Sequence, residues 1–228
     1  MSAPKTRSSR PAQGRALVTR ARLLAAGRAA FAAKGLAGTN LTEDILRPSG
    51  VSAGSFYHQF VDKTDLLLAV MDEAAERRRA VVLSPEAFRS DRTIDEVLRD
   101  AADRFLQSLD EEAHDWTIQL RERANPDPRI ATRVAQGRET WKSVLTHLLG
   151  PFAEAGADLD GVLDLFIAFF VGLTATYLDL SVAERSAQRR VLPERIAGFL
   201  LDGVRSQLDP RSPRARRPLP PAQPGTGQ

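Results

Sequence analysis

The chain has 228 residues, of which 43% are hydrophobic and 27% are charged, with a formal net charge of +3 and no cysteine. This length allows one large domain or two small ones, and the lack of cysteine excludes disulfides, thiolate metal sites and a cysteine nucleophile. The first 22 residues lack the apolar stretch of a signal peptide and the longest apolar run, residues 165–173, is too short to span a bilayer, so we expect a cytoplasmic protein without a membrane partner.

Basic residues are concentrated at both ends of the chain. Residues 1–22 contain six lysines and arginines and no acidic residue, and the segment after Leu208 is rich in proline and contains four arginines. Such composition is typical of disordered segments, and a basic arm suits a polyanion. We therefore predict a disordered basic arm over residues 1–15 and a disordered tail over residues 209–228. Whether either segment contacts a polyanion or is only solvated stays open.

Residues 16–208 are predicted to be helical nearly throughout. Apolar and polar residues never alternate over the length of a strand, and alanine, leucine, arginine and glutamate, which are good helix formers, dominate. In chain order, the predicted helices cover about residues 17–34, 41–47, 53–60, 63–82, 94–109, 113–124, 129–149, 160–180 and 190–208. The predicted fold class is therefore all-α, with an N-terminal three-helix head over residues 16–62 and a larger helical body over residues 63–208.

The second predicted helix of the head is short and has a signal at each end. Asn40 and Glu43 fit a capping box, in which one side chain accepts from the amides of the first turn and the other reaches back. Pro48 is expected to stop the helix by Arg47, because residues before proline avoid the α region.

The turn and the helix after it complete a helix-turn-helix pattern. Gly50 supplies a tight turn, Ser52 is a good N-cap, and Phe56 and Phe60 lie four residues apart on the inward face. A recognition helix must enter the major groove of DNA closely, and the small residues at 53–55 leave its leading end slim. The residues predicted to contact double-stranded DNA are Thr42, Glu43, Ser52, Ala53, Gly54, Ser55, Tyr57, His58 and Lys63.

Residues 19–68 resemble the tetracycline-repressor-like (TetR) family. The residues that carry the resemblance are Thr19-Arg20, Phe31, Lys34-Gly35, Ile45, the segment 50–60 and Lys63. The resemblance implies a sequence-specific, DNA-binding transcriptional regulator, in most cases a repressor that a small-molecule effector releases from a palindromic operator. The operator sequence, the effector and the target genes stay open.

The resemblance also implies roles for individual residues of the head. Thr42 and Lys63 would bind phosphates, Tyr57 would bind the DNA backbone, and His58 would bind the backbone or a base. Residues 52–55 would line the groove. Contacts with phosphate position a protein on DNA, whereas contacts with base edges specify the sequence.

The body carries aromatic and polar residues that are candidates for an effector site. These are Trp116, Gln119, Trp141, Phe152 and Tyr177. Ligand pockets are mostly apolar with a few placed polar groups, so we expect a mainly apolar or aromatic small molecule. Each aromatic residue considered alone is also compatible with a plain core position.

The predicted helix over residues 160–180 is apolar nearly all round. Such a helix must be covered on every side, and the helices of one chain cover one side only. We therefore predict a homodimer in which this helix and the last one form a four-helix bundle with their copies. The residues predicted to form the interface are Phe166, Phe170, Ile196 and Phe199.

No catalytic residue, cofactor or metal site is predicted. The sequence has no phosphate-binding glycine loop and no nucleophile–base pair, and His114 and His147 have no second ligand at metal-binding spacing. The charged runs 77–79 and 110–112 are interpreted as solvated. Three alternatives remain open: an activator, a regulator without a small-molecule effector, and a helical enzyme or cofactor-binding protein.

Overall fold

The computed structural model describes residues 10–82, 93–149 and 159–208, and this part of the chain contains helices and no strands. The all-α fold class is confirmed. The helices are α1 (Arg10–Gly38), η1 (Leu41–Leu46), α2 (Arg47–Ser49), α3 (Ala53–Tyr57), α4 (Lys63–Val82), α5 (Ile94–Glu111), α6 (Ala113–Glu122), α7 (Pro128–Leu149), α8 (Leu159–Leu178), α9 (Val182–Gln188) and α10 (Leu192–Leu208).

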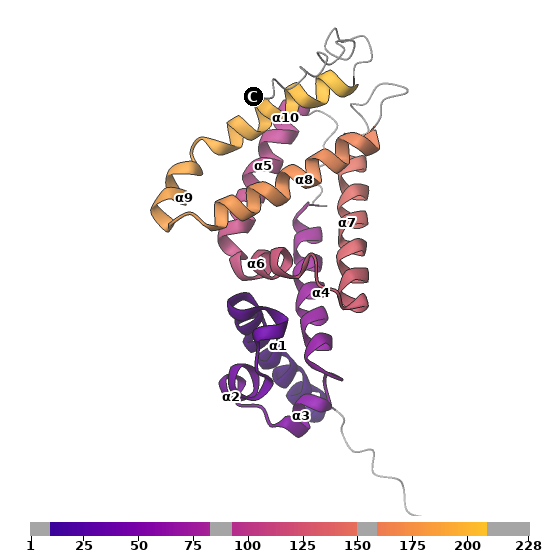
Figure 1. Cartoon of the computed structure of the whole chain (residues 1–228), viewed down its shortest axis with the longest axis vertical. Helices are drawn as coiled ribbons and strands as arrows, with labels where there is room; N and C mark the ends of the chain where they lie inside the picture. The colour runs from indigo at the N-terminus through magenta and orange to yellow at the C-terminus, as the bar shows by residue number, and fades with distance from the viewer. Residues whose placement is uncertain (1–9, 83–92, 150–158, 209–228) are drawn as a thin grey trace, which may run out of the picture.

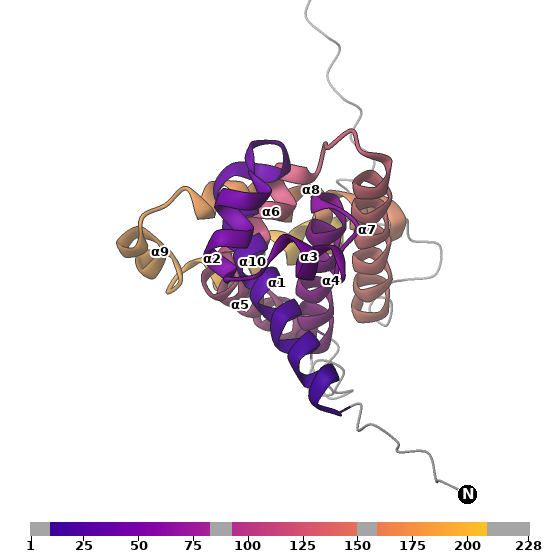
Figure 2. The same cartoon turned by 90° about the horizontal axis from the view of Figure 1, so that it is seen from below.

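The molecule is elongated, with the head at one end and α8 and α10 at the other (Figure 1). Helix α4 runs from the head into the body, and α6 lies across the junction between the two. Helices α5 and α7 lie on either side of α4. Figure 2 shows the same chain from the head end, where the first turns of α1 project beyond the rest of the bundle.

Two hydrophobic cores hold the chain together. The first lies in the head, but it also includes Leu66 and Leu67 of α4, Ile118 of α6 and Ile130 of α7. The second lies among α5, α6, α8 and α10. Because body helices contribute to the first core, the head packs directly on the body and its core extends past the boundary predicted after residue 62.

Helix α1 begins at Arg10, earlier than predicted. Residues 10–15 are therefore helical, and the expectation of a disordered arm over this part of the segment was wrong. Pro11 does not prevent the early start, because the first turn of a helix has no intrahelical partner for the missing N–H. The helix also continues past its expected end to Gly38, after an interruption at Gly35, where φ is 68° and ψ is 173°.

The expectation that Pro48 ends the second helix was also wrong. Arg47 has α-helical angles (φ −61°, ψ −51°), and Pro48 lies in the first turn of α2. The preceding segment η1 is a wider π-helical turn, in which the N–H of Arg47 donates to the carbonyl of Thr42. Proline normally clashes with the carbonyl four residues before it, and a wider turn relieves this clash.

Helix α9 was not predicted as a separate element. Its N-terminus has a capping box, in which Ser181 Oγ accepts from the N–H of Glu184 and the Glu184 side chain accepts from the N–H of Ser181. The pattern of serine followed three residues later by glutamate is the signal that identifies such a start. The predicted tail after residue 208 and residues 1–9 of the arm lie outside the described residues.

Helix α8 is the one described helix that is long and apolar enough to cross a membrane by length and composition. Its stretch Asp160–Leu178 has a mean hydropathy of 1.8, and 28% of it is buried. The sequence-based judgement from the continuous run 165–173 therefore underestimated the apolar length of this helix. Asp164 pairs with Arg138 and Lys142 of α7 at 2.7 and 3.0 Å, so α8 is held against a neighbouring helix by charge as well as by packing.

Candidate nucleic-acid interface

The first helix of the helix-turn-helix is capped by two side chains. Asn40 Oδ1 accepts from the N–H groups of Thr42 and Glu43 at 2.9 and 3.0 Å. The side chain that reaches back to the N–H of Asn40 is Asp44, at 2.8 Å, and not Glu43 as predicted. Glu43 instead pairs with Arg47 at 2.6 Å, one turn later. The predicted cap is thus present, with its second partner shifted by one residue.

The turn between the two helices has the geometry that the sequence predicts. Gly50 adopts the left-handed conformation (φ 64°, ψ 26°), which costs glycine little because it lacks a Cβ. Ser52 then caps α3, since the N–H of Ser55 donates to Ser52 Oγ at 3.2 Å. The two serine hydroxyls also lie 3.0 Å apart. This cap fixes the direction in which α3 leaves the turn.

Two phenylalanines anchor α3 in the core of the head. Phe56 is 0% exposed and Phe60 is 3% exposed, and their ring centroids lie 5.8 Å apart. The inward orientation predicted for both is confirmed. Tyr57, between them in sequence, is 61% exposed. The anchoring therefore leaves the opposite side of α3 free, as a recognition helix requires.

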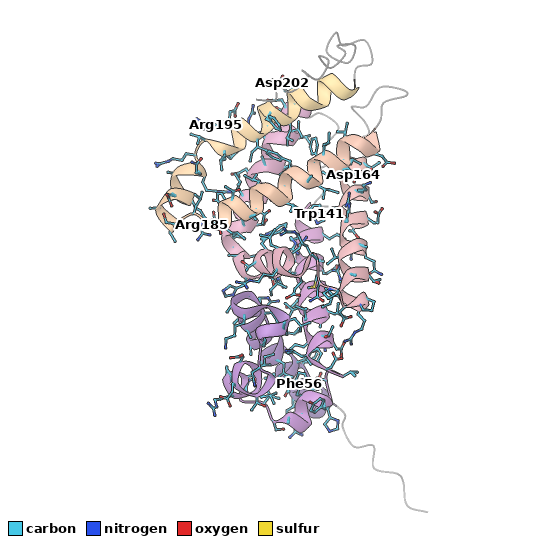
Figure 3. The ribbon with its side chains drawn as sticks, in the orientation of Figure 1. Phe56, Trp141, Asp164, Arg185, Arg195 and Asp202 are labelled. Atoms are coloured by element: carbon cyan, nitrogen blue, oxygen red, sulfur yellow. The ribbon has the colours of Figure 1, made fainter. Side chains whose placement is uncertain are left out.

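Figures 2 and 3 show that η1, α3 and the start of α4 lie together at the head end of the molecule. The residues predicted to contact DNA lie on η1, on α3 with its two caps, and at the first residue of α4, which is Lys63. Those with exposed side chains or surfaces are Thr42, Glu43, Ser52, Ala53, Gly54, Tyr57 and His58. Ser55 and Lys63 are half-buried. Lys63 Nζ donates to the carbonyl of Thr39 at 2.6 Å, which holds its ammonium beside the start of η1.

Arg20 is a basic residue of the head that was not among the residues predicted to contact DNA. Its guanidinium lies over the ring of Phe60, 4.6 Å from the centroid, so it is held next to the end of α3. A second cation near the head, Lys34, donates to Asp44 at 2.7 Å and lowers the pKa of that carboxyl. The position of Arg20 at the start of the family-like pattern was the signal available in the sequence.

The middle of the body contains a buried cation beside Trp116. Arg78 is 8% exposed, and its guanidinium lies 4.3 Å from the centroid of the Trp116 ring. Arg78 also donates to Gln119 Oε1 at 3.2 Å, and burial lowers the pKa of Arg78. The interpretation of the run 77–79 as solvated is therefore wrong for its central residue. Trp116 itself donates to Ser108 Oγ at 3.2 Å.

A pocket of about 340 Å³ lies between α4 and α7. It is lined by Asp72, Ala75, Glu76, Arg78, Arg79, Arg133, Gln136, Gly137, Thr140 and Trp141. Seven of these ten residues are polar or charged, but most of the surface that lines the pocket is apolar, so the pocket combines apolar walls with charged groups. Figure 3 labels Trp141 on α7 at this side of the body.

The aromatic candidates for the effector site do not converge on one cavity in the described residues. Trp116 packs against Phe105 in the second core, whereas Trp141 lines the pocket. Tyr177 is 1% exposed and donates to Asp110 at 3.1 Å; burial and this carboxylate raise the pKa of Tyr177 to about 12. Phe152 lies outside the described residues. No group of three or more described His, Asp or Glu residues is arranged to hold a metal ion.

The residues predicted to form the dimer interface differ in burial. Phe166 and Ile196 are 5% and 3% exposed within their own chain, so they offer little surface to a partner. Each lies on the inward face of its helix, in the second core. Phe170 is half-buried against Phe105, with ring centroids 4.6 Å apart. Phe199 is 64% exposed, and of the four it offers the largest fraction to a partner.

Other apolar side chains lie beside Phe199 and extend the apolar surface that it forms. Its ring stacks on Phe169 of α8 at 5.3 Å, and Leu165, one turn earlier on α8, is 66% exposed. Helix α10 is packed against α5 on its other side. We call Leu165, Phe169 and Phe199 the α8–α10 apolar face.

Comparison with known proteins agrees with this geometry. Residues 23–70 match the family model described as bacterial regulatory proteins, tetR family. The HTH-type transcriptional regulator CymR of Pseudomonas putida is 30% identical over 163 residues, which span 68% of this chain and 76% of CymR.

Solved structures share the fold at lower identity. GusR of Salmonella enterica has a TM-score of 0.66 and 22% identity, covering 83% of this chain and 95% of that one. FadR of Bacillus subtilis, in complex with stearoyl-CoA, has a TM-score of 0.63 and 13% identity, covering 83% and 99%. The chain therefore belongs to the tetR family of bacterial regulatory proteins and is a DNA-binding transcriptional regulator.

Proposed function

We propose that the chain binds a palindromic operator as a homodimer and represses transcription until a small-molecule effector releases it. The observation that carries this proposal is the anchored recognition helix. Phe56 and Phe60 fix α3 in the core, while Tyr57 on the same helix is 61% exposed. A rigid helix with one free side is the device with which helix-turn-helix proteins read the major groove.

The side chains around α3 support separate roles in positioning and in reading. Ala53 and Gly54 are exposed and small, so the leading end of the helix can approach base edges closely. Lys63 retains two N–H donors after its bond to Thr39, because an ammonium group has three, and it can give them to a phosphate. Tyr57 and His58, at the C-terminal end of α3, are exposed and offer further polar contacts.

The α8–α10 apolar face supports the dimer. Apolar side chains as exposed as Leu165 and Phe199 gain most from a second copy of the same face, because a two-fold interface is self-complementary. Two heads related by a two-fold axis match an operator with two inverted half-sites.

The pocket between α4 and α7 is the proposed effector site. Helix α4 supplies half of its lining and continues into the core of the head, so a change at the pocket can tilt the head. The mainly apolar lining with charged residues among it favours an effector that has an apolar body and a few polar or charged groups. The stearoyl-CoA of the Bacillus subtilis FadR structure belongs to that protein.

Selection of bound sequences from a random pool of duplex DNA tests the operator proposal. We expect the full-length protein to enrich an inverted repeat whose half-site centres lie about one helical turn or a multiple of it apart. The enriched duplex should bind about 1,000-fold more tightly than unrelated DNA at the same salt concentration. Binding that is weak and blind to sequence would contradict the proposal.

Fluorescence of Trp141 tests the effector proposal. The chain has two tryptophans, so a Trp116→Phe protein reports from the pocket alone. In a screen of small metabolites we expect one class of compound to change this fluorescence and to release the selected operator in the same wells. The operator should weaken binding of that compound by the same factor, because coupling is reciprocal. A compound that binds tightly in the pocket and leaves operator affinity unchanged would refute the release mechanism.

A further inference from the structure

Two buried carboxylates of α6 hold the head helix α1. Asp115 and Glu122 are each 5% exposed, and their spacing of seven residues places them on the same face of α6, two turns apart. Arg28 Nε of α1 donates to Asp115 at 2.8 Å. The main-chain N–H of Leu36 donates to Glu122 Oε1, also at 2.8 Å. Helix α6 thus contacts α1 at two points, as its place across the junction in Figure 1 allows.

The second of these points lies at a kink in the head. Helix α1 is interrupted at Gly35, which has a left-handed φ of 68°, and Leu36 is the first residue after the interruption. The next turn leads to Thr39, whose hydroxyl donates back to the carbonyl of Gly35 at 2.6 Å. Lys63 Nζ donates to the carbonyl of Thr39. Glu122 therefore binds the main chain at the point where α1 leads into the helix-turn-helix.

Glu122 also connects this kink to the turn between α6 and α7. Its second oxygen accepts from Asn125 Nδ2 at 2.5 Å, and Asn125 Oδ1 accepts from the N–H of Asp127 at 2.9 Å. Arg129, in the first turn of α7, pairs with Asp62 at 2.9 Å. Asp62 lies just before α4, so the end of α6 and the start of α7 each contact the head.

The position of Glu122 is unfavourable for α6 alone. It is the last residue of that helix, where the helix dipole is negative and a carboxylate is disfavoured. It is also buried, and a buried carboxylate requires hydrogen-bond partners. The partners come from the head and from the following turn, so the residue is stabilised by what it joins rather than by its own helix.

Asp115 is joined in the same way. It accepts from Arg77 Nη2 of α4 at 2.5 Å as well as from Arg28 of α1. Arg28 bonds Glu73 of α4 too, and these hydrogen bonds raise the pKa of Arg28 against the effect of its burial. Hydrogen bonds between charged groups are short and directional, so they fix an angle as well as a contact. A head connected through α4 alone would be freer to tilt.

We propose that Glu122 and Asp115 are positioning residues that fix the head on the body and thereby determine which half-site spacing the dimer accepts. This inference rests on the proposed function, because spacing has meaning only for two heads on one operator. A head held at one angle presents its recognition helix at one distance from its copy. A head that tilts accepts several distances, and the dimer loses its preference among them.

The experiment compares duplexes that carry the two selected half-sites with spacers lengthened or shortened by one and two base pairs. We expect the wild-type protein to prefer one spacer by about tenfold over its neighbours, the size of effect that one poor base pair has. Glu122→Ala should bring these affinities within about threefold of one another. Glu122→Gln should keep most of the preference, since its amide oxygen still accepts from Leu36, although its NH2 group cannot accept from Asn125 Nδ2. Glu111→Ala, at the exposed end of α5, is the control and should also keep it.

Thermal melting of each variant separates positioning from stability. A residue with only a structural role would lower the melting temperature and leave the ranking of spacers unchanged, and that result in Glu122→Ala would overturn the inference. If Glu122→Ala does not fold, Asp115→Ala, which removes both accepting oxygens, carries the same expectation of a flattened ranking and the same refutation. A wild-type protein that binds one half-site as tightly as the pair would instead contradict the proposed function itself.

Discussion

A Phe199→Glu protein should be a folded monomer that binds the operator about 100-fold more weakly than the wild-type protein, because the second half-site no longer adds to the first. Phe199 is 64% exposed and stacks on Phe169 of α8, so it belongs to the surface and not to the core of its own chain. Two-fold symmetry places the new charge in the interface twice. An unpaired charge in an apolar interface costs several kcal/mol, roughly.

Light scattering with circular dichroism separates dissociation from unfolding in this variant. Val182→Glu is a matched control, because Val182 is 77% exposed on α9 and lies outside the α8–α10 apolar face. Phe166→Glu should behave differently from both, since Phe166 is 5% exposed and the charge would enter the second core and unfold the chain. A Phe199→Glu protein that stays folded and dimeric would remove α10 from the interface.

A Phe56→Ala protein should lose operator binding because the head is destabilised by about 3–5 kcal/mol, the usual cost of removing a buried phenylalanine ring. Phe56 is 0% exposed and lies 5.8 Å from Phe60 between ring centroids. The ring fixes α3 to the core, so its loss frees the recognition helix even in molecules that stay folded. Urea denaturation followed by circular dichroism measures the loss of stability.

Tyr57→Ala is the control for this change, because it removes a ring of similar size from the exposed side of the same helix. It should weaken operator binding and leave the free energy of unfolding within about 1 kcal/mol of the wild-type value. If both variants had the same stability, Phe56 would not be the anchor of α3.

The sequence predicted the head well because its signals are local. The bounds of α4 agree with the predicted 63–82, and Asp62 accepts from the N–H of Asp65 at 2.7 Å as the cap requires. Gly50 and Ser52 likewise form the predicted turn and cap. Each of these interactions joins residues at most four apart, so a sequence pattern contains both partners.

Local signals were misread where two of them compete. Pro48 predicted the end of a helix, but the preceding π turn makes room for its ring, and the helix continues to Ser49. The basic segment 10–15 has the charge of a disordered arm, but it forms the first turns of α1, and Pro11 is compatible with the first turn of a helix.

The sequence by itself therefore determined the all-α class, the helix-turn-helix and the inward face of α3, since these follow from periodicity and from contacts within one or two turns. Only the tertiary structure decided which side of the apolar helix α8 is core and which is free. A helix with apolar residues on every side has no polar side that would identify the exposed one. The tertiary structure alone also showed that Arg78 is buried, that Trp116 and Trp141 lie in different places, and that Glu122 reaches the kink after Gly35. Glu122 and Leu36 are 86 residues apart in the chain, and their contact depends on how α1 and α6 pack rather than on any pattern within either helix.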